Sequence, residues 1–422
     1  MGVSGWSVIA QTFMPGQGAT ICTVTPLHLL DGGMAEDIHF YGKKLASYLK
    51  RLDSLIGNPE DRKLIRAYLD HLKAQGLSTG RLYKITWTLV DIRKRLASPT
   101  FKAARRKDIE RLVAEVHSSD YTANTKSDHK KILKKFYKFV RYGNGDRKTQ
   151  YPPEVAWVDT SIKRNEMKEP EVITEDEARR MIEAATTTRD KALIAVAYEG
   201  GFRIGELLGM EIKDVSFDES GAKVGVHGKT GPRSVRLVAS APLLTRYIDE
   251  HPFKSEPGSP LWINPVDSGR NAGKRMAYMT TREAILRVAG RAGIKKRIYP
   301  HLFRHSAATR DASYNINERL LEIRYGWAKG SRMAARYTHI KDEKTVDDAL
   351  LGLYSGKEIK PLEPAFHPVV CVRCQEKNSP GVRFCGRCGT PLDQRELVKS
   401  SVELEDLKAK VDEILKRLEP RK

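Results

Sequence analysis

The sequence predicts a mainly α-helical protein of several domains, one of which contains a small antiparallel β-sheet. The 422 residues are more than one hydrophobic core usually serves. Through most of the chain, apolar residues recur at intervals of three and four, which is the helical period. Short β-type runs bounded by turn residues occur between 215 and 238. We therefore expect helical domains, with the sheet inside one of them.

The opening segment, residues 1–33, differs in composition from the rest of the chain. It contains no Lys or Arg and a single acidic residue, Asp31. It also lacks the basic stretch with which a signal peptide begins. We interpret it as disordered, or as a non-native start, because Met34 opens a segment that resembles the remainder in composition.

A helical domain is predicted for residues 34–150. Its four amphipathic helices carry the apolar stripes 64–72, 82–96, 109–116 and 132–140. Residues 101–150 hold 14 Lys and Arg against 6 acidic residues. This excess favours a clamp on the DNA backbone over an ordinary solvated helix face. The fourth helix alone carries Lys130, Lys131, Lys134, Lys135 and Lys138.

Residues 151–172 have two adjacent prolines and no periodicity, which is typical of a linker. A second domain, residues 173–356, begins at the capping box Thr174–Glu177. Two helices follow, then β-type runs at 215–217, 223–226 and 234–238, and then further helices.

Basic side chains at helical spacing suggest a phosphate site in this second domain. His301, Arg304 and His305 are three and four residues apart, so a helix places them on one face. Arg203 follows a glycine pair where a helix stops, a position suited to bidentate phosphate contact. Tyr337 lies in a polar setting some thirty residues after the histidines, and an activated tyrosine can form covalent intermediates.

The order and spacing of these residues resemble the tyrosine recombinase family of phage integrases and Xer-like proteins, over roughly residues 60–350. The resemblance implies that Tyr337 is the nucleophile and that Arg203 and Arg304 hold the phosphate. It implies that Lys229, in the hairpin turn Gly228–Gly231, protonates the leaving deoxyribose oxygen, and that His301 assists proton handling. Glu206 would be a structural companion of the first arginine, and His305 would have a supporting role.

One position departs from the usual family pattern. Most members have Gly-His some nine residues before the tyrosine, whereas this chain has Gly326-Trp327, ten residues before it. This form looks similar to archaeal members. Trp327 can donate a hydrogen bond and pack on the helix of the tyrosine, but it cannot shuttle protons. The acid–base demand on His301 and Lys229 should therefore be greater.

The resemblance implies a site-specific recombinase or integrase that cuts and rejoins DNA through a 3′-phosphotyrosyl intermediate. The two arginines would stabilise the transition state electrostatically, so we expect the strand-transfer chemistry to need no metal. Two alternatives remain: a non-catalytic sequence-specific DNA-binding protein on a recombinase scaffold, and a type IB topoisomerase-like relaxing enzyme. Retention of the nucleophile argues against the first, and strand exchange between two sites would separate the second.

The net charge of +21 favours nucleic acid as the partner over an acidic membrane. No run of 18 apolar residues occurs, so we expect no membrane span. We expect double-stranded DNA as the partner and a cytoplasmic, nucleoid-associated location. The resemblance further implies a homotetramer on paired DNA sites.

The C-terminal part predicts a metal site followed by a heptad helix. Cys371, Cys374, Cys385 and Cys388 form two Cys-x-x-Cys pairs, which predict a closed, structural zinc site in a zinc ribbon at 367–392. A redox dithiol is the weaker alternative. Residues 395–419 carry apolar residues every seven, which indicates a coiled-coil helix and self-association. A helix docked on its own protein is the other interpretation.

Overall fold

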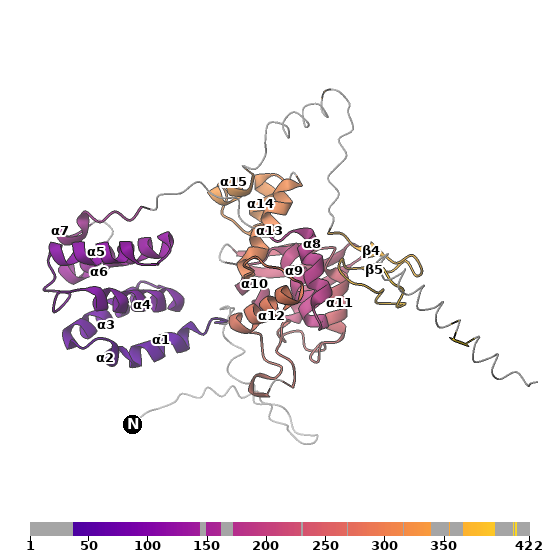
Figure 1. The fold of residues 1–422 in the computed structure, drawn as a ribbon, viewed down its shortest axis with the longest axis horizontal. Helices are drawn as coiled ribbons and strands as arrows, with labels where there is room; N and C mark the ends of the chain where they lie inside the picture. The colour runs from indigo at the N-terminus through magenta and orange to yellow at the C-terminus, as the bar shows by residue number, and fades with distance from the viewer. Residues whose placement is uncertain are drawn as a thin grey trace, which may run out of the picture. The chain divides into compact units, whose positions relative to one another are not determined.

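The computed structural model describes residues 37–143, 149–161, 172–228, 231–267, 269–314, 316–338, 354, 366–392, 408, 410 and 411. These residues form a mainly helical protein with one three-stranded antiparallel sheet and a small C-terminal ribbon, as predicted (Figure 1). The predicted segment 1–33 and all heptad positions except Val411 lie outside the described residues. Within the part of the chain that the structure describes, every helix is too short or too polar to span a lipid bilayer.

The first domain is a cluster of helices around one hydrophobic core (Figure 1). The four predicted stripes are the buried faces of α3 to α6, and short helices precede and follow them. Helix α3 begins at Asn58, whose side-chain oxygen accepts the N–H groups of Glu60 and Asp61. The helices are α1 (Tyr41–Lys50), α2 (Leu52–Leu55), α3 (Pro59–Ala74), α4 (Thr79–Arg95), α5 (Arg106–Ser118), α6 (Ala123–Tyr142) and α7 (Pro153–Ala156).

The core of the first domain continues past the predicted boundary at residue 150. Val155 on α7 and Val158 after it are 0% and 2% exposed and belong to the same core as α3–α6. The ammonium group of Lys134 donates to the carbonyl oxygens of Ala156 and Val158, both at 2.9 Å. The segment 151–158 therefore packs on this domain, and a linker can begin only after it.

The same packing divides the lysines of α6 into two groups. Lys134 and Lys138 lie over the ring of Tyr151, with Nζ 4.7 and 5.2 Å from the ring centroid. Lys131 and Lys135 are exposed. Only some of the lysines on α6 are therefore free to contact a partner, because Lys134 and Lys138 make contacts within the domain.

The second domain surrounds α9, which is buried on nearly all sides and so lacks an amphipathic pattern. The predicted capping box opens α8, where Thr174 N–H donates to Glu177 Oε2 and Glu177 N–H to Thr174 Oγ1. The helices are α8 (Glu175–Ala184), α9 (Thr188–Gly200), α10 (Ile204–Gly209), η2 (Ile212–Asp214), α11 (Ala241–Asp249), η3 (Gly269–Asn271), α12 (Tyr278–Arg291), α13 (Pro300–Ser313), α14 (Glu318–Tyr325) and α15 (Arg332–Thr338).

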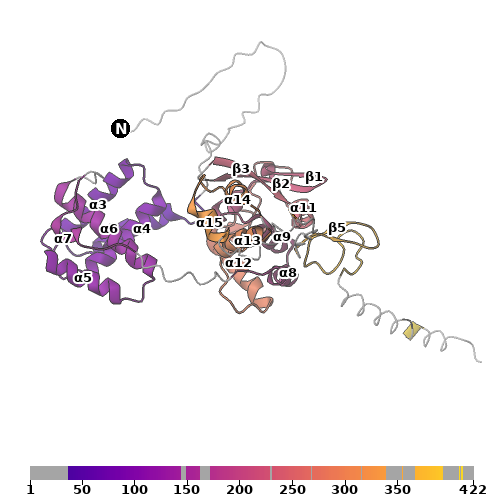
Figure 2. The same ribbon diagram turned by 90° about the horizontal axis from the view of Figure 1, so that it is seen from above.

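The sheet of this domain consists of β1 (Val215–Asp218), β2 (Gly221–Gly228) and β3 (Gly231–Leu237), in that order. It lies along one edge of the domain (Figure 2). Asp218 pairs with Gly221 and Gly228 with Gly231, so each hairpin turn has two residues between its paired ends. The alternating burial of β2 places Ala222, Val224 and Val226 in the core.

The ribbon contains β4 (Val369–Val370) and β5 (Lys377–Asn378) and packs against the second domain. The ring of Phe366, which precedes it, lies 4.9 Å from that of Tyr198 on α9. The backbone N–H of Leu243 on α11 donates to Ser379 Oγ at 3.2 Å. Gly381 has a φ of +80°, and a Cβ there would lie 2.6 Å from the carbonyl oxygen of Arg179.

Candidate active site and zinc centre

Arg203 stands where the chain leaves α9 and enters α10. Gly201 ends α9 with a φ of +58°, and a Cβ at this position would meet the Tyr325 ring at 2.6 Å. The Arg203 guanidinium donates to Glu206 Oε1 at 2.6 Å and to the carbonyl oxygen of Gly326 at 2.8 Å. The side chain is therefore held from two directions.

Glu206 is a shared acceptor for two arginines. Besides Arg203, it receives two hydrogen bonds from Arg233 on β3, at 2.9 and 2.7 Å. Burial raises the pKa of Glu206, but the hydrogen bonds and charges of Arg233 and Arg203 outweigh this and lower it to about 2. The carboxylate is therefore ionised at neutral pH.

Arg233 was not singled out by the sequence. Its Nε also donates to the carbonyl oxygen of Arg324, at 2.9 Å, so it joins β3 to both Glu206 and the end of α14. In the sequence it is one basic residue among 74. Its place just after the β2–β3 turn is the only signal that could have drawn attention to it.

Arg304 on α13 is 4% exposed and lies on the other side of the same carboxylate. Its guanidinium donates to the carbonyl oxygens of Gly201 and Tyr325, at 3.0 and 2.5 Å. One of its nitrogens is 4.0 Å from Glu206 Oε2. Burial and the charge of Arg203 lower the pKa of Arg304 to about 10, so the group stays charged at neutral pH.

Tyr337 on α15 is 3% exposed and stacks on Trp327. The two rings are 5.5 Å apart and within 3° of parallel, and Trp327 in turn stacks on Tyr325 at 5.0 Å. Arg304 lies within 5.7 Å of the Trp327 ring centroid. Trp327 therefore contacts both the candidate nucleophile and the arginine with its ring, by stacking on Tyr337 and by a cation–π contact with Arg304.

The hydroxyl of Tyr337 lies 2.6 Å from Nδ1 of His305. Burial raises the pKa of Tyr337, although Arg336 and Arg304 oppose the shift. The phenol therefore carries its proton at neutral pH. His305 is thus in direct contact with the candidate nucleophile, which the sequence reasoning did not foresee in assigning it a supporting role.

His301 occupies the exposed side of α13, one turn before His305, and the two rings meet edge to face at 4.7 Å. Partial burial and the charges of Arg304, Arg203 and Arg336 lower the pKa of His301. The imidazole is therefore biased toward its neutral form beside these arginines.

Lys229 lies outside the described residues. The strand end before it is close to the arginine site, because a Cβ on Gly228 would lie 2.7 Å from Glu206 Oε1 and 3.4 Å from a terminal nitrogen of Arg203. The described geometry thus brings together Arg203, Arg304, Trp327 and Tyr337, with His301 on the same helix as Arg304. The place of Lys229 in this site stays a prediction.

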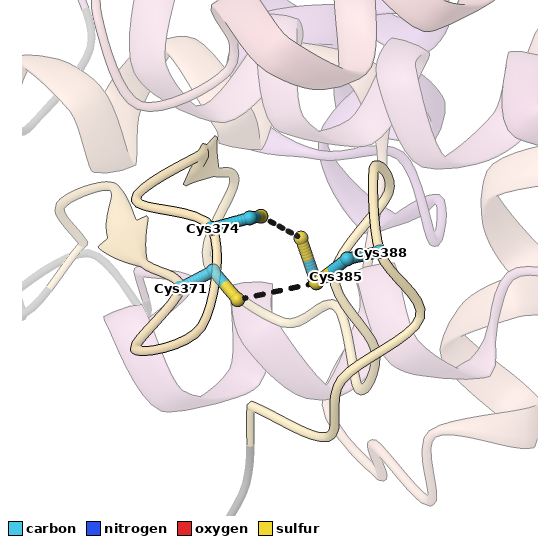
Figure 3. Close-up of side chains that lie close together, drawn as sticks. All are labelled: Cys371, Cys374, Cys385 and Cys388. Carbon is cyan, nitrogen blue, oxygen red and sulfur yellow. Dashed lines mark hydrogen bonds between the residues drawn. The ribbon is translucent and has the colours of Figure 1, made fainter.

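The four cysteines converge in the ribbon (Figure 3). Their sulfur atoms all lie within 4.8 Å of one another, with Cys371–Cys388 at 3.6 Å and Cys374–Cys385 at 3.5 Å. Four thiolates bound to zinc at about 2.3 Å would be about 3.8 Å apart, so the donor set fits a tetrahedral ion. Hydrogen bonds from Thr390 lower the pKa of Cys388, which favours the thiolate form of that one ligand.

Comparison with known proteins agrees with the fold. Residues 171–344 match the phage integrase family, and residues 370–392 match the zinc-ribbon domain. The fold and this match identify residues 171–344 as a domain of the phage integrase type. The chain is similar to tyrosine recombinases, a family of DNA strand-transferring enzymes.

Individual relatives carry that name. The tyrosine recombinase XerA of Pyrococcus horikoshii is 23% identical over 265 residues, which cover 63% of this chain and 85% of the relative. A tyrosine recombinase of Thermosipho africanus is 26% identical over 297 residues, covering 66% and 95%.

Solved structures share the fold. XerH recombinase bound to a palindromic difH substrate has a TM-score of 0.52 at 17% identity, covering 74% of this chain and 95% of that one. The Tn1549 transposon integrase in complex with transposon right end DNA has a TM-score of 0.53 at 16% identity, covering 69% and 99%.

Proposed function

We propose that this protein is a site-specific DNA recombinase that cleaves and rejoins strands through a 3′-phosphotyrosyl intermediate. The observation that carries the proposal is the assembly of two charged arginines and a buried tyrosine around one tryptophan and one carboxylate. A protein that only binds DNA needs the positive charge but has no use for a nucleophile placed beside it.

In the proposed reaction, Tyr337 Oη attacks a backbone phosphorus and the bond from phosphorus to the 5′-oxygen breaks. The tyrosyl proton leaves as the new bond forms, and Lys229 supplies a proton to the departing oxygen. The products are a 3′-phosphotyrosyl link and a free 5′-hydroxyl. Because the energy of the broken bond is kept in the new one, the reverse attack by another 5′-hydroxyl rejoins the strands.

Arg203 and Arg304 would stabilise the extra negative charge of the transition state. A guanidinium has five N–H donors, and each of these arginines gives two to the described acceptors. The remaining donors can contact phosphate oxygens from groups that are already fixed in place. We propose that this charge replaces a metal ion in the strand transfer.

Zinc bound by the four cysteines would have a structural role. All four donors of a tetrahedral site come from the protein, so no position is left for a substrate or a water molecule.

We further propose that the protein acts as a homotetramer on two DNA sites. XerH was solved on a palindromic substrate, and a palindrome offers two equivalent half-sites to two copies of one protein. Exchange between two such sites then requires four copies. The heptad pattern at 395–419 supports self-association from the sequence.

Covalent trapping tests the proposed reaction. The protein and its Tyr337→Phe variant would be mixed with fragmented genomic and mobile-element DNA and quenched in detergent, and the protein-linked ends would be sequenced. We expect ends joined through a 3′-phosphate at one recurring sequence, absent from the variant. Attachment scattered over many sequences would favour a relaxing enzyme. Tight specific binding without any covalent species would favour the DNA-binding alternative.

A further inference from the structure

Among the described residues, the hydroxyl of Tyr337 has one side-chain hydrogen-bond partner, Nδ1 of His305 at 2.6 Å. The two residues come from different helices, α15 and α13, so the contact depends on tertiary packing. The ring planes are tilted by 40° with centroids 6.0 Å apart, so the residues meet at their polar atoms rather than by stacking.

The protonation states allow the phenol to donate this hydrogen bond to the ring. Burial, together with the charges of His301, Arg336 and Arg304, lowers the pKa of His305 to about 4, so its ring is neutral at neutral pH. Tyr337 is a phenol under the same conditions and has one O–H to donate. A neutral imidazole has one bare nitrogen, and at Nδ1 that nitrogen can accept the phenolic hydrogen.

We propose that His305 is the general base that removes the proton from Tyr337 during strand cleavage. The inference rests on the proposed function. As Oη bonds to phosphorus, the O–H bond breaks and its proton moves to His305 Nδ1. The bond from phosphorus to the 5′-oxygen breaks at the same time, and that oxygen takes a separate proton from Lys229. In the rejoining step, His305 returns its proton to the leaving phenol.

The bound DNA would increase the basicity of His305 at the moment when it is needed. The ring is a weak base in the free protein partly because cationic groups surround it. Arg304 is among these groups and is also one of the proposed phosphate ligands. A phosphodiester adds one negative charge, and the transition state adds a second, so the field that opposes protonation is compensated.

His301 is less suited to this role. It lies on the exposed side of α13, and the described residues show no hydrogen bond between its ring and Tyr337. Its position suits contact with the DNA or the leaving group, as the family resemblance implies. His305 would then accept the proton of Tyr337, and His301 would contact the DNA or the leaving group.

The decisive experiment separates nucleophile activation from leaving-group protonation. The substrate is a duplex bearing the cleavage sequence recovered by covalent trapping, made once with a normal phosphodiester and once with sulfur in place of the bridging 5′-oxygen. A thiolate leaves without protonation, so the sulfur substrate bypasses the general acid. The variants are His305→Asn, which keeps a hydrogen-bond acceptor near Nδ1 but is no base, and Lys229→Ala as the matched control.

We expect His305→Asn to slow cleavage by about 100-fold or more on both substrates, in the range typical of a lost general base. Lys229→Ala should be slow on the normal substrate and recover on the sulfur one. If the cleavage rate of His305→Asn recovered on the sulfur substrate, His305 would be a general acid. If its rate on the normal substrate stayed within about threefold of wild type, His305 would only position Tyr337. Unchanged DNA affinity and circular dichroism spectra verify that the variants fold.

A measurement on the free protein tests the hydrogen bond without DNA. Nitrogen NMR of the histidine-labelled full chain should show His305 neutral, with its proton on Nε2 and none on Nδ1. Tyr337→Phe should shift the Nδ1 signal. A proton on Nδ1 would overturn the proposal, because the ring would then be the donor. If no DNA yields a covalent adduct with the wild type, the proposed function fails, and this spectrum still reports whether His305 accepts from Tyr337.

Discussion

Glu206 fixes the position of the Arg203 guanidinium. It receives hydrogen bonds from Arg203 and from Arg233, so three side chains from α10, its N-terminal boundary and β3 form one ionic group around a buried carboxylate. Removing Glu206 would leave the two arginines without their carboxylate, which costs more than the lost contacts. The position of Arg203 therefore depends on a residue outside the family motif.

Arg233→Lys should slow cleavage by about tenfold or more while leaving DNA affinity nearly unchanged. A lysine cannot make the paired contact with Glu206, so Arg203 loses its fixed partner geometry. Arg236→Lys is the matched control, since Arg236 lies on the same strand and makes a paired contact with the exposed Asp218. Single-turnover cleavage rates compare the two. Equal effects would show that Arg233 does not position the site.

The pKa of Glu206 predicts an acid-sensitive contribution to stability. Because the folded-state pKa is about 2, against 4.5 for an ordinary glutamate, the native state favours the ionised form. The stabilisation is complete above pH 4.5 and disappears as the pH falls toward 2, and its size is on the order of 3 kcal/mol. Glu206→Gln should unfold at lower urea concentration at pH 7 and lose less stability between pH 5 and pH 3 than wild type. Parallel pH dependences in the two proteins would contradict this.

At the scale of helices and strands, the exposed lysines of α6 make a different prediction from the buried ones. Lys131 and Lys135 are exposed, so the double change to Gln should weaken DNA binding and reduce the magnitude of its logarithmic salt dependence by about 2. Lys138 is buried beside Tyr151, so Lys138→Gln should lower the thermal midpoint with a smaller effect on the salt dependence. Binding titrations at several salt concentrations, together with thermal unfolding, separate the two groups. If the double substitution left the salt dependence of DNA binding unchanged, Lys131 and Lys135 of α6 would not contact the DNA.

Much of the helical architecture could be predicted from the sequence because it is periodic. The stripes of α3–α6 and the capping box of α8 are local patterns, and the structure confirms them. The short helix α7 was not predicted, because four residues are too few to show a helical period. The buried α9 was predicted from its apolar content, although its burial on nearly all sides weakens the periodic signal.

Only those residues of the candidate site that belong to sequence motifs could be predicted. Arg203, Arg304, Trp327 and Tyr337 come together as the resemblance implies. The contact of His305 with Tyr337 and that of Arg233 with Glu206 join helices or strands distant in sequence. Such pairs depend on how the elements pack, and a single sequence contains no record of that packing.

At the scale of the whole molecule, the zinc centre should contribute to the stability of the second domain. Ser379 accepts a backbone hydrogen bond from α11, and Val382 and Phe366 pack on the domain core. Zinc that organises the ribbon therefore also holds these contacts. Extraction of zinc with a strong chelator should lower the thermal midpoint of the full chain by several degrees, and added zinc should restore it. A midpoint unaffected by zinc loss would mean that the ribbon contributes nothing to the domain.

Strand transfer itself should continue in EDTA when the zinc site stays filled. In the proposed reaction the arginines would supply the charge that a catalytic ion otherwise provides, so removal of free magnesium should change the cleavage rate by less than about twofold. Zinc content measured on the same samples is the control. Loss of cleavage at full zinc occupancy would refute metal-free transfer.

The shared carboxylate of Glu206 also constrains how this protein can evolve. A change at Glu206 leaves both arginines without their carboxylate, and a change at either arginine removes hydrogen bonds that hold that carboxylate. Each first step is therefore unfavourable even where the final triple replacement would be acceptable. The three positions should consequently be inherited together, across lineages whose DNA-contacting surfaces have diverged. Arg233, on a strand outside the family motif, would then be as constrained through descent as Arg203, the arginine proposed to contact the phosphate.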